Sequence, residues 1–230
     1  MLIWLIIMAP AFIFMIYAQF KVNSAFKKYS KVANSQGITG AEAAGRLLRA
    51  NDLTNVSVEG VKSKLGDHYD PRKKVLRLSP EVAGTPSVAA LGIVAHEVGH
   101  AAQDKTGYSF MRFRSALVPA ASVGSNIGFI CILVGGLLVG LSEVLGMSVM
   151  WLGVFLFSLA VLFTLVTLPV EFNASNRARE MLRSTGMVST QEYEGASAVL
   201  SAAALTYVAA MIQAVAQLVY FVMMVLGARR

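Results

Sequence analysis

The chain has 230 residues, of which 56% are hydrophobic and only 14% are charged. A soluble domain carries about 25% charged residues, so this composition excludes an ordinary water-soluble protein as well as a disordered or collagen-like one. The one cysteine excludes an internal disulfide. The formal net charge of +7 could indicate nucleic-acid binding, but the sequence contains no nucleic-acid-binding motif. We therefore expect no nucleic-acid partner.

Long uncharged stretches predict four membrane crossings. No charged side chain precedes Lys21, and later uncharged stretches cover residues 115–142, 144–170 and 195–228. A helix needs about 20 apolar residues to cross the hydrocarbon core of a bilayer, so each stretch is long enough. The first lacks the basic leader of a signal peptide and is expected to remain as an anchor. The predicted transmembrane helices are residues 1–20, 116–142, 144–170 and 205–228.

The basic residues predict on which side of the membrane the hydrophilic segment 21–115 lies. It holds 15 Lys or Arg and 8 Asp or Glu, whereas the link between the second and third spans holds only Glu143. Basic residues beside membrane spans favour the cytoplasmic side. We therefore predict a multi-pass plasma-membrane protein whose segment 21–115 faces the cytoplasm, although Arg229 and Arg230 oppose this orientation.

Within segment 21–115, local patterns predict helices and strands. A capping-box pattern that begins at Thr39 predicts a short helix ending near Asn51. Further along, apolar β-branched residues flank an Asp-Pro turn. They predict a hairpin or two neighbouring strands near residues 55–64 and 67–79. A small α+β domain is therefore expected next to the four helices.

The next predicted helix, from residues 85–87 to about Gln103, carries the sequence His96-Glu97-Val98-Gly99-His100. Residues four apart lie on one face of a helix, so both imidazoles can bind one zinc ion. Glu97 then lies beside the open coordination position, where a water molecule can bind. The alternative, an ordinary helix with satisfied polar side chains, is disfavoured because two histidines and a carboxylate are costly on an otherwise apolar helix.

A catalytic zinc ion needs a third protein ligand, and no third histidine follows the motif. After the third span, the acidic candidates are Glu171, Glu180, Glu192 and Glu194. Glu171 is favoured because two membrane crossings return it to the side of the His96 helix. The competing interpretation makes Glu171 a helix N-terminal carboxylate at the membrane edge. We predict that residues 171–204 form a helix that carries this third ligand.

These motifs resemble those of a known family, the YugP-like neutral zinc metallopeptidases of bacterial membranes. The resemblance covers nearly all of the chain, and its motifs are Asp67-His68-Tyr69-Asp70-Pro71, the eight residues from His96 to Gln103, and Glu171-Phe172-Asn173-Ala174-Ser175. The chain is more distantly similar to the HtpX and prenyl-protein membrane proteases. In those proteins an aspartate stands four residues after the ligand glutamate, whereas this chain has Ser175.

The resemblance implies a membrane-bound zinc endopeptidase of the gluzincin type. It implies one catalytic zinc ion held by His96, His100 and Glu171, with Glu97 as the base. Asn173 or Asn176 is then a candidate for orienting the histidines in place of the missing aspartate. The candidates for stabilising the oxyanion of the reaction are His68, Tyr69, Arg177 and Tyr193.

Protein or peptide substrates at the membrane surface are expected, because Glu171 directly follows the third span. The alternative is a zinc-binding membrane structural protein or an inactive homologue that does not cleave proteins. An intramembrane protease is disfavoured because no aspartate lies in any predicted span, and a transporter because the spans carry no ionisable group. A homo-oligomer is compatible with the sequence, which does not decide the oligomeric state.

Overall fold

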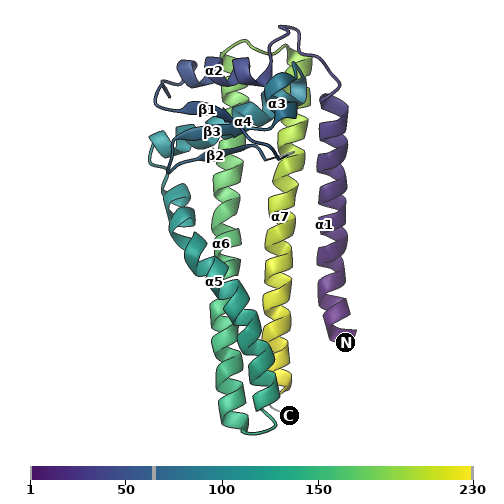
Figure 1. The fold of residues 1–230 in the computed structure, drawn as a ribbon. Helices are drawn as coiled ribbons and strands as arrows, with labels where there is room; N and C mark the ends of the chain where they lie inside the picture. Colours follow the sequence, from purple (N-terminus) through teal and green to yellow (C-terminus); the bar gives the residue numbers. More distant parts are fainter. Residues whose placement is uncertain (1, 64–65, 229–230) are drawn as a thin grey trace. The chain divides into compact units, whose positions relative to one another are not determined.

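The computed structural model describes residues 2–63 and 66–228, which form seven α-helices and three β-strands (Figure 1). The helices are α1 (Leu2–Tyr29), α2 (Gly40–Ala50), α3 (Pro80–Gly84), α4 (Val88–Lys105), α5 (Ser109–Leu138), α6 (Glu143–Ser184) and α7 (Thr190–Gly227). The strands are β1 (Ser57–Gly60), β2 (His68–Asp70) and β3 (Val75–Leu78). The chain divides into two compact units, and α1, α5, α6 and α7 each contribute residues to both.

Four helices in the described part of the chain, α1, α5, α6 and α7, are long and apolar enough to cross a membrane. The mean hydropathy of their most apolar windows is 2.0 to 2.5, and most residues in those windows are not buried inside the protein. Apolar side chains that protein does not cover are expected where lipid is the solvent. The chain is therefore a mostly helical membrane protein. The first helix is longer than the predicted span 1–20, because it continues through basic residues to Tyr29.

The first unit consists of residues up to Tyr17, Arg112–Pro169 and the residues from Tyr207 onward. In it, α5 and α6 approach so closely that a Cβ on Gly128 would lie 2.8 Å from the carbonyl oxygen of Gly153. Small residues at helix contacts are typical of membrane proteins, because close van der Waals packing holds such helices together. The Phe221 ring on α7 packs edge-on against Phe157 of α6.

The second unit consists of Ala18–Met111 and Val170–Thr206 and contains a three-stranded sheet of order β1-β3-β2. β1 pairs with β3 in parallel, and β2 pairs with β3 in antiparallel orientation. The predicted strand at 67–79 is thus two strands, because the Asp-Pro turn lies inside that stretch. Asp70 stabilises the turn by accepting hydrogen bonds from the backbone N–H groups of Arg72 and Lys73.

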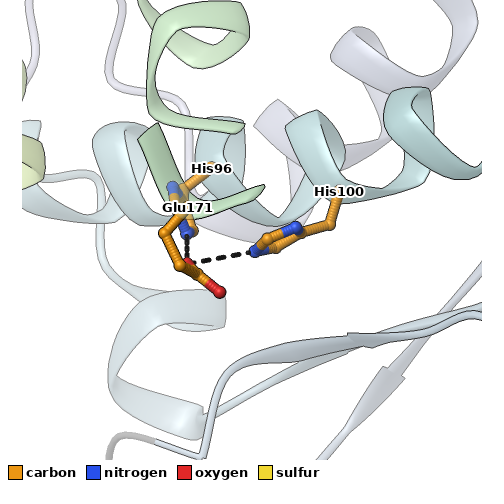
Figure 2. A group of neighbouring side chains, drawn as sticks. All are labelled: His96, His100 and Glu171. Carbon is orange, nitrogen blue, oxygen red and sulfur yellow. Dashed lines mark hydrogen bonds and ion pairs between the residues drawn. The ribbon is translucent and has the colours of Figure 1, made fainter. Parts of the chain in front are cut away.

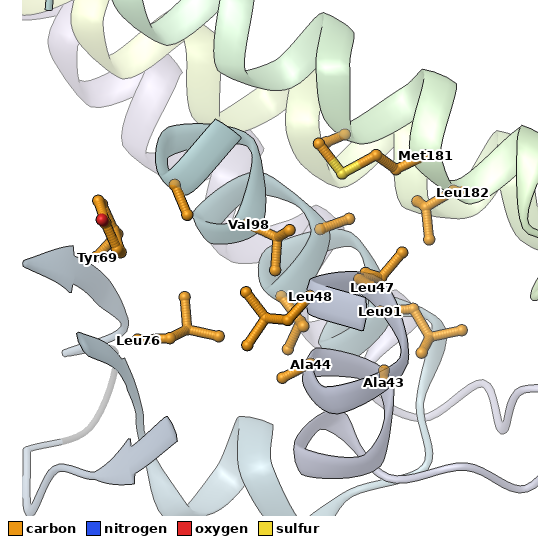
Figure 3. Close-up of a cluster of buried hydrophobic side chains, with 14 of the residues drawn as sticks. Ala43, Ala44, Leu47, Leu48, Tyr69, Leu76, Leu91, Val98, Met181 and Leu182 are labelled. Carbon is orange, nitrogen blue, oxygen red and sulfur yellow. The ribbon is translucent and has the colours of Figure 1, made fainter. Parts of the chain in front are cut away.

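A hydrophobic core joins α2, the sheet, α4 and the hydrophilic end of α6 (Figure 3). α2 begins at the predicted capping box, in which Thr39 and Glu42 satisfy each other's backbone N–H groups. Its buried face contributes Leu47 to the core. α4 is buried on nearly all sides, so Leu91 and Val98 pack inside the unit. This packing holds α4, which carries the His-Glu-x-x-His motif, in the interior of the second unit.

Glu171 lies in the middle of a helix. Both predictions, a ligand-bearing helix 171–204 and a helix N-terminal carboxylate at Glu171, began a helix at this residue and are wrong on this point. α6 runs without a break from Glu143 to Ser184, and Pro169 lies inside it. A proline in a helix removes one intrahelical hydrogen bond, which the packing of the following turns offsets here because Ala174 and Ala178 are fully buried. The predicted helix 171–204 is instead two helices, separated at a turn where Gly186 adopts φ of +62°.

Glu192 fastens the start of α7 to the segment before α2. Its carboxylate accepts hydrogen bonds from the backbone N–H of Ser189, at 2.7 Å, and from both the backbone N–H and the hydroxyl of Ser35. We expect Glu192→Ala to destabilise the protein by about 1–3 kcal/mol, because the buried Glu192 carboxylate and its hydrogen bonds to the two serines are lost. Thermal unfolding in detergent would measure this. The exposed Glu194 provides the control, and an equal effect of Glu194→Ala would contradict the explanation.

Candidate metal centre

The two histidines of the motif lie one turn apart on the same face of α4. Their rings meet edge to face, with centroids 4.8 Å apart. Gly99 lies between them and allows α6 to approach, because a Cβ at this position would lie 2.6 Å from the carbonyl oxygen of Ala174. This close contact brings α6 within reach of both imidazoles.

Glu171 on α6 meets the two histidines at one point (Figure 2). One carboxylate oxygen, Oε2, lies 3.2 Å from Nε2 of His96 and 3.5 Å from Nε2 of His100. The Glu171 side chain is only 3% exposed, and the histidine side chains are 13% and 11% exposed. Three side chains from two helices thus direct electron-pair donors at one small, nearly buried volume.

The donor set fits a zinc ion. Zinc binds histidine nitrogens and carboxylate oxygens at about 2.0–2.2 Å in a tetrahedron, which separates neighbouring ligand atoms by about 3.3 Å. The observed separations of 3.2 and 3.5 Å match this value, and all three donor atoms lie within 4.8 Å of one another. The residues present are therefore suited to hold a divalent metal ion.

The other ring nitrogen of each histidine is engaged as well. Nδ1 of His96 lies 3.2 Å from the hydroxyl of Ser175, and Nδ1 of His100 lies 2.9 Å from Oε1 of Gln103. Such outer contacts orient metal-binding histidines and leave Nε2 for the metal. Ser175 lies one turn after Glu171 on α6, so a hydroxyl contacts His96 from this position.

Glu97 is buried and is held by the sheet. Its Oε2 accepts a hydrogen bond of 2.9 Å from the backbone N–H of Tyr69, on the edge strand β2. The Tyr69 hydroxyl in turn donates to Asp104, at 2.6 Å, and Lys74 also donates to Asp104. The backbone N–H of Tyr69 thus holds the Glu97 carboxylate in place, and the Tyr69 side chain is itself hydrogen-bonded to the last turn of α4.

The cluster shifts the pKa of each carboxyl group in it. Burial raises the pKa of Glu97, while the neighbouring imidazoles of His96 and His100 act in the opposite direction. Burial also acts to raise the pKa of Glu171, but hydrogen bonds and charge from the two imidazoles bring it well below the ordinary glutamate value. Two neighbouring glutamates with opposite shifts are typical of sites where one carboxylate is a permanent anion and the other exchanges protons.

The pKa values of His100 and Tyr69 are also shifted. Burial lowers the pKa of His100, but the hydrogen bond to Glu171 and the charges of Glu97 and Glu171 raise it overall. Burial raises the pKa of Tyr69, and the hydrogen bond to Asp104 raises it further. The Tyr69 hydroxyl therefore keeps its proton at neutral pH and donates a hydrogen bond to Asp104.

A polar cavity of about 450 Å³ opens beside Tyr69, at the C-terminal end of α4. Asp104 forms part of its wall and is paired with Lys74, while Lys105 donates to the backbone carbonyls of Asn51 and Asp52. Tyr69 therefore both lines this cavity and holds Glu97 through its backbone N–H.

The remaining predicted site residues make contacts of other kinds. His68 donates through Nδ1 to the carbonyl of Gly66, at 2.7 Å, and its Nε2 lies 3.3 Å from Arg77, so its hydrogen bonds stay within the sheet region. Asn176 accepts from Arg179. Tyr193 packs against the core, with the Arg183 guanidinium 5.9 Å from its ring centroid.

Asn173 and Arg177 form a pair on α6. Oδ1 of Asn173 accepts from Nε of Arg177, at 2.9 Å, and from Nε2 of Gln103, at 3.0 Å. Asn173 therefore reaches His100 only through Gln103, and the direct contact to a motif histidine from this stretch of α6 comes from Ser175. Asn173 and Asn176 are the predicted candidates for orienting the histidines. In the structure Ser175 contacts His96 directly, and Asn173 acts on His100 one contact further away, through Gln103.

Comparison with known proteins places the chain. The family model described as "putative neutral zinc metallopeptidase" matches residues 4–226. The chain belongs to this family. The "putative membrane protease YugP" of Bacillus subtilis (strain 168) is 46% identical over 213 residues, which cover 93% of this chain and 92% of that protein. No solved structure matches the chain. The resemblance to the YugP-like neutral zinc metallopeptidases is therefore confirmed, and the family implies zinc.

The sequence did not predict that Gln103 and Asp104 contribute to the site of this family member. The sequence patterns predict Gln103 only as the end of a helix and of the family motif, and they predict no role for Asp104. The spacing carried a usable signal, since Gln103 is three residues after His100 and shares its face of the helix. Asp104 likewise shares a face with Glu97, seven residues earlier.

The close helix contact at Gly99 leads to a prediction. Gly99→Ala should destabilise this metallopeptidase-family protein by about 1–3 kcal/mol, because the added methyl group forces α4 and α6 apart. It should also weaken zinc binding, since the two helices carry different ligands. Thermal unfolding and a zinc competition titration measure both effects. In the control Gly45→Ala on α2, the new Cβ meets only the flexible Arg49 side chain, so stability should be unchanged or slightly higher.

Proposed function

We propose that this protein is a membrane-bound zinc metalloendopeptidase of the gluzincin type, which hydrolyses peptide bonds of membrane-associated proteins. His96, His100 and Glu171 are the ligands of one zinc ion, and Glu97 is the general base. The observation that carries the proposal is the convergence of Glu171 Oε2 on Nε2 of both motif histidines, at 3.2 and 3.5 Å, next to a buried Glu97. Membership of a zinc metallopeptidase family supports the same conclusion.

When bound, zinc polarises the scissile carbonyl and makes a water molecule acidic enough to act as a nucleophile near neutral pH. Glu97 accepts the proton of that water and delivers it to the leaving amine, as a general base and then a general acid. The raised pKa of Glu97 favours the first step, because a carboxylate whose conjugate acid has a higher pKa is a stronger base. The backbone N–H of Tyr69 keeps the Glu97 carboxylate in place.

Action at the membrane surface is supported by the order of residues along the helices. Glu171 directly follows the uncharged residues 144–170 of α6, and α4 is followed within ten residues by Arg112 and Arg114, which precede the apolar part of α5. We place the catalytic residues on the cytoplasmic side, because the basic residues gather between the first two spans. Segments of membrane proteins that emerge from the bilayer are the substrates that fit this location.

The proposal is tested with the protein purified in detergent. It should contain about one zinc ion per chain and cleave casein or a membrane-protein substrate, with cleavage abolished by a zinc chelator and restored by added zinc. Zinc content is measured by atomic emission and cleavage by gel electrophoresis. Cleavage that persists after complete removal of zinc would refute the mechanism.

A further inference from the structure

Gln103 is a buried amide whose polar atoms are all engaged. It lies in the last turn of α4 with a relative exposure of 0%. A buried amide is tolerated only when it is hydrogen-bonded, so its partners constrain how it is oriented. Those partners are the ring of His100, the backbone of α6 and the side chain of Asn173.

The orientation of the Gln103 amide follows from the chemistry of its partners. One end lies 2.7 Å from the carbonyl oxygen of Val170, which can only accept a hydrogen bond, so this end must be the NH2 group. The other end is therefore the carbonyl oxygen, and it lies 2.9 Å from Nδ1 of His100. Because that oxygen can only accept, Nδ1 of His100 must carry a hydrogen. The electron pair of a neutral His100 is then on Nε2, which faces Glu171.

The neighbouring side chains fix the same orientation independently. Oδ1 of Asn173 accepts from Nε2 of Gln103, at 3.0 Å, and from Nε of Arg177, at 2.9 Å. A guanidinium can only donate, so Arg177 determines which end of the Asn173 amide faces Gln103. The order of donors and acceptors thus runs from Arg177 through Asn173 and Gln103 to His100, and no amide in it can be reversed without losing a bond.

Gln103 also joins the two helices that carry the cluster. Its NH2 group binds the carbonyl of Val170, the residue immediately before Glu171. A single side chain on α4 therefore contacts a predicted ligand on its own helix and the backbone next to the predicted ligand on α6. Because the two contacts share one planar amide, a shift of α6 along α4 would break one of them.

We propose that Gln103 is a positioning residue of the metal centre, which holds His100 in the tautomer that presents Nε2 to the metal and sets the position of Glu171. The inference rests on the proposed zinc site and goes beyond it by assigning a role to a residue outside the ligands and the base. Outer hydrogen bonds of this kind change metal affinity by about 10- to 100-fold when they are removed.

The test compares Gln103→Leu with Gln103→Glu and with the control Gln191→Leu, which alters an exposed residue at the start of α7. Zinc affinity is measured by competition with a chromophoric chelator in detergent. The His100 tautomer is read from nitrogen-15 spectra of the histidine-labelled, chelator-treated protein. Gln103→Leu should bind zinc about 10- to 100-fold more weakly and lose the preference for hydrogen on Nδ1. Gln191→Leu should match the original protein in both measurements.

Gln103→Glu keeps an acceptor for His100 and loses the NH2 group that binds Val170. It should retain the Nδ1–H tautomer, with a zinc affinity between those of the original protein and Gln103→Leu. If Gln103→Leu does not fold, this tautomer measurement decides the matter, and a lost Nδ1 preference in Gln103→Glu would overturn the proposal. Unchanged zinc affinity and tautomer in Gln103→Leu would also overturn it. Failure of the original protein to bind zinc would instead refute the proposed function.

Discussion

Replacing Glu97 with glutamine is expected to lower peptidase turnover by about 10²- to 10⁴-fold, the contribution typical of a general acid–base catalyst. Glutamine has nearly the same shape and still offers an oxygen to the Tyr69 N–H, which holds Glu97 at 2.9 Å. It cannot accept a proton from water. The loss should therefore appear in kcat, while the zinc content stays near that of the original protein.

Parallel measurements of turnover and zinc content separate this expectation from general damage. Glu81→Gln, at an exposed position on α3, is a control of the same chemical change and should leave both quantities unaltered. Undiminished turnover in Glu97→Gln would remove Glu97 from the mechanism. If the original protein binds zinc tightly and cleaves no substrate, the alternative of a structural zinc protein or inactive homologue would be favoured instead.

Replacing Glu171 with alanine is expected to weaken zinc binding by at least about 100-fold, since loss of a direct ligand should exceed the 10- to 100-fold cost of losing an outer contact. Glu171 contributes the one carboxylate among the three proposed zinc ligands, and its side chain is 3% exposed between the two imidazoles. Without it, the histidines of α4 would hold the ion alone. Turnover at limiting zinc should fall in parallel.

Zinc affinity by chelator competition measures this effect. Glu180→Ala is the matched control, because Glu180 lies on the same helix and is exposed. Circular dichroism of both variants would check that α6 remains helical. A full zinc complement in Glu171→Ala at low free zinc would show that another residue supplies the third ligand.

The two designs together test the division of labour between neighbouring glutamates. Glu97 lies beside His96 in sequence, whereas Glu171 reaches the cluster from 75 residues away. If the division is correct, one variant retains zinc and loses turnover, and the other loses zinc first. The opposite pattern would exchange the two assignments.

The amino-acid sequence alone predicted the features that depend on local chemistry. The length and apolar character of single segments predicted four helices able to cross a membrane, and an interval of four residues predicted that His96 and His100 share a helix face. These predictions succeed because hydropathy and helical periodicity act over one segment at a time. Strand pairing did not follow in the same way, since the prediction treated 67–79 as one strand although it folds into β2 and β3.

Only the tertiary structure decided which distant groups meet. Four glutamates after the third span were candidates for a ligand, and the approach of α6 to α4 at Gly99 brings Glu171 to the histidines. The same approach gives Gln103 its contact to the Val170 carbonyl, and the edge strand brings the Tyr69 N–H to Glu97. Contacts of this kind depend on the packing of whole elements against one another, to within a few tenths of an ångström, which no local pattern in the chain encodes.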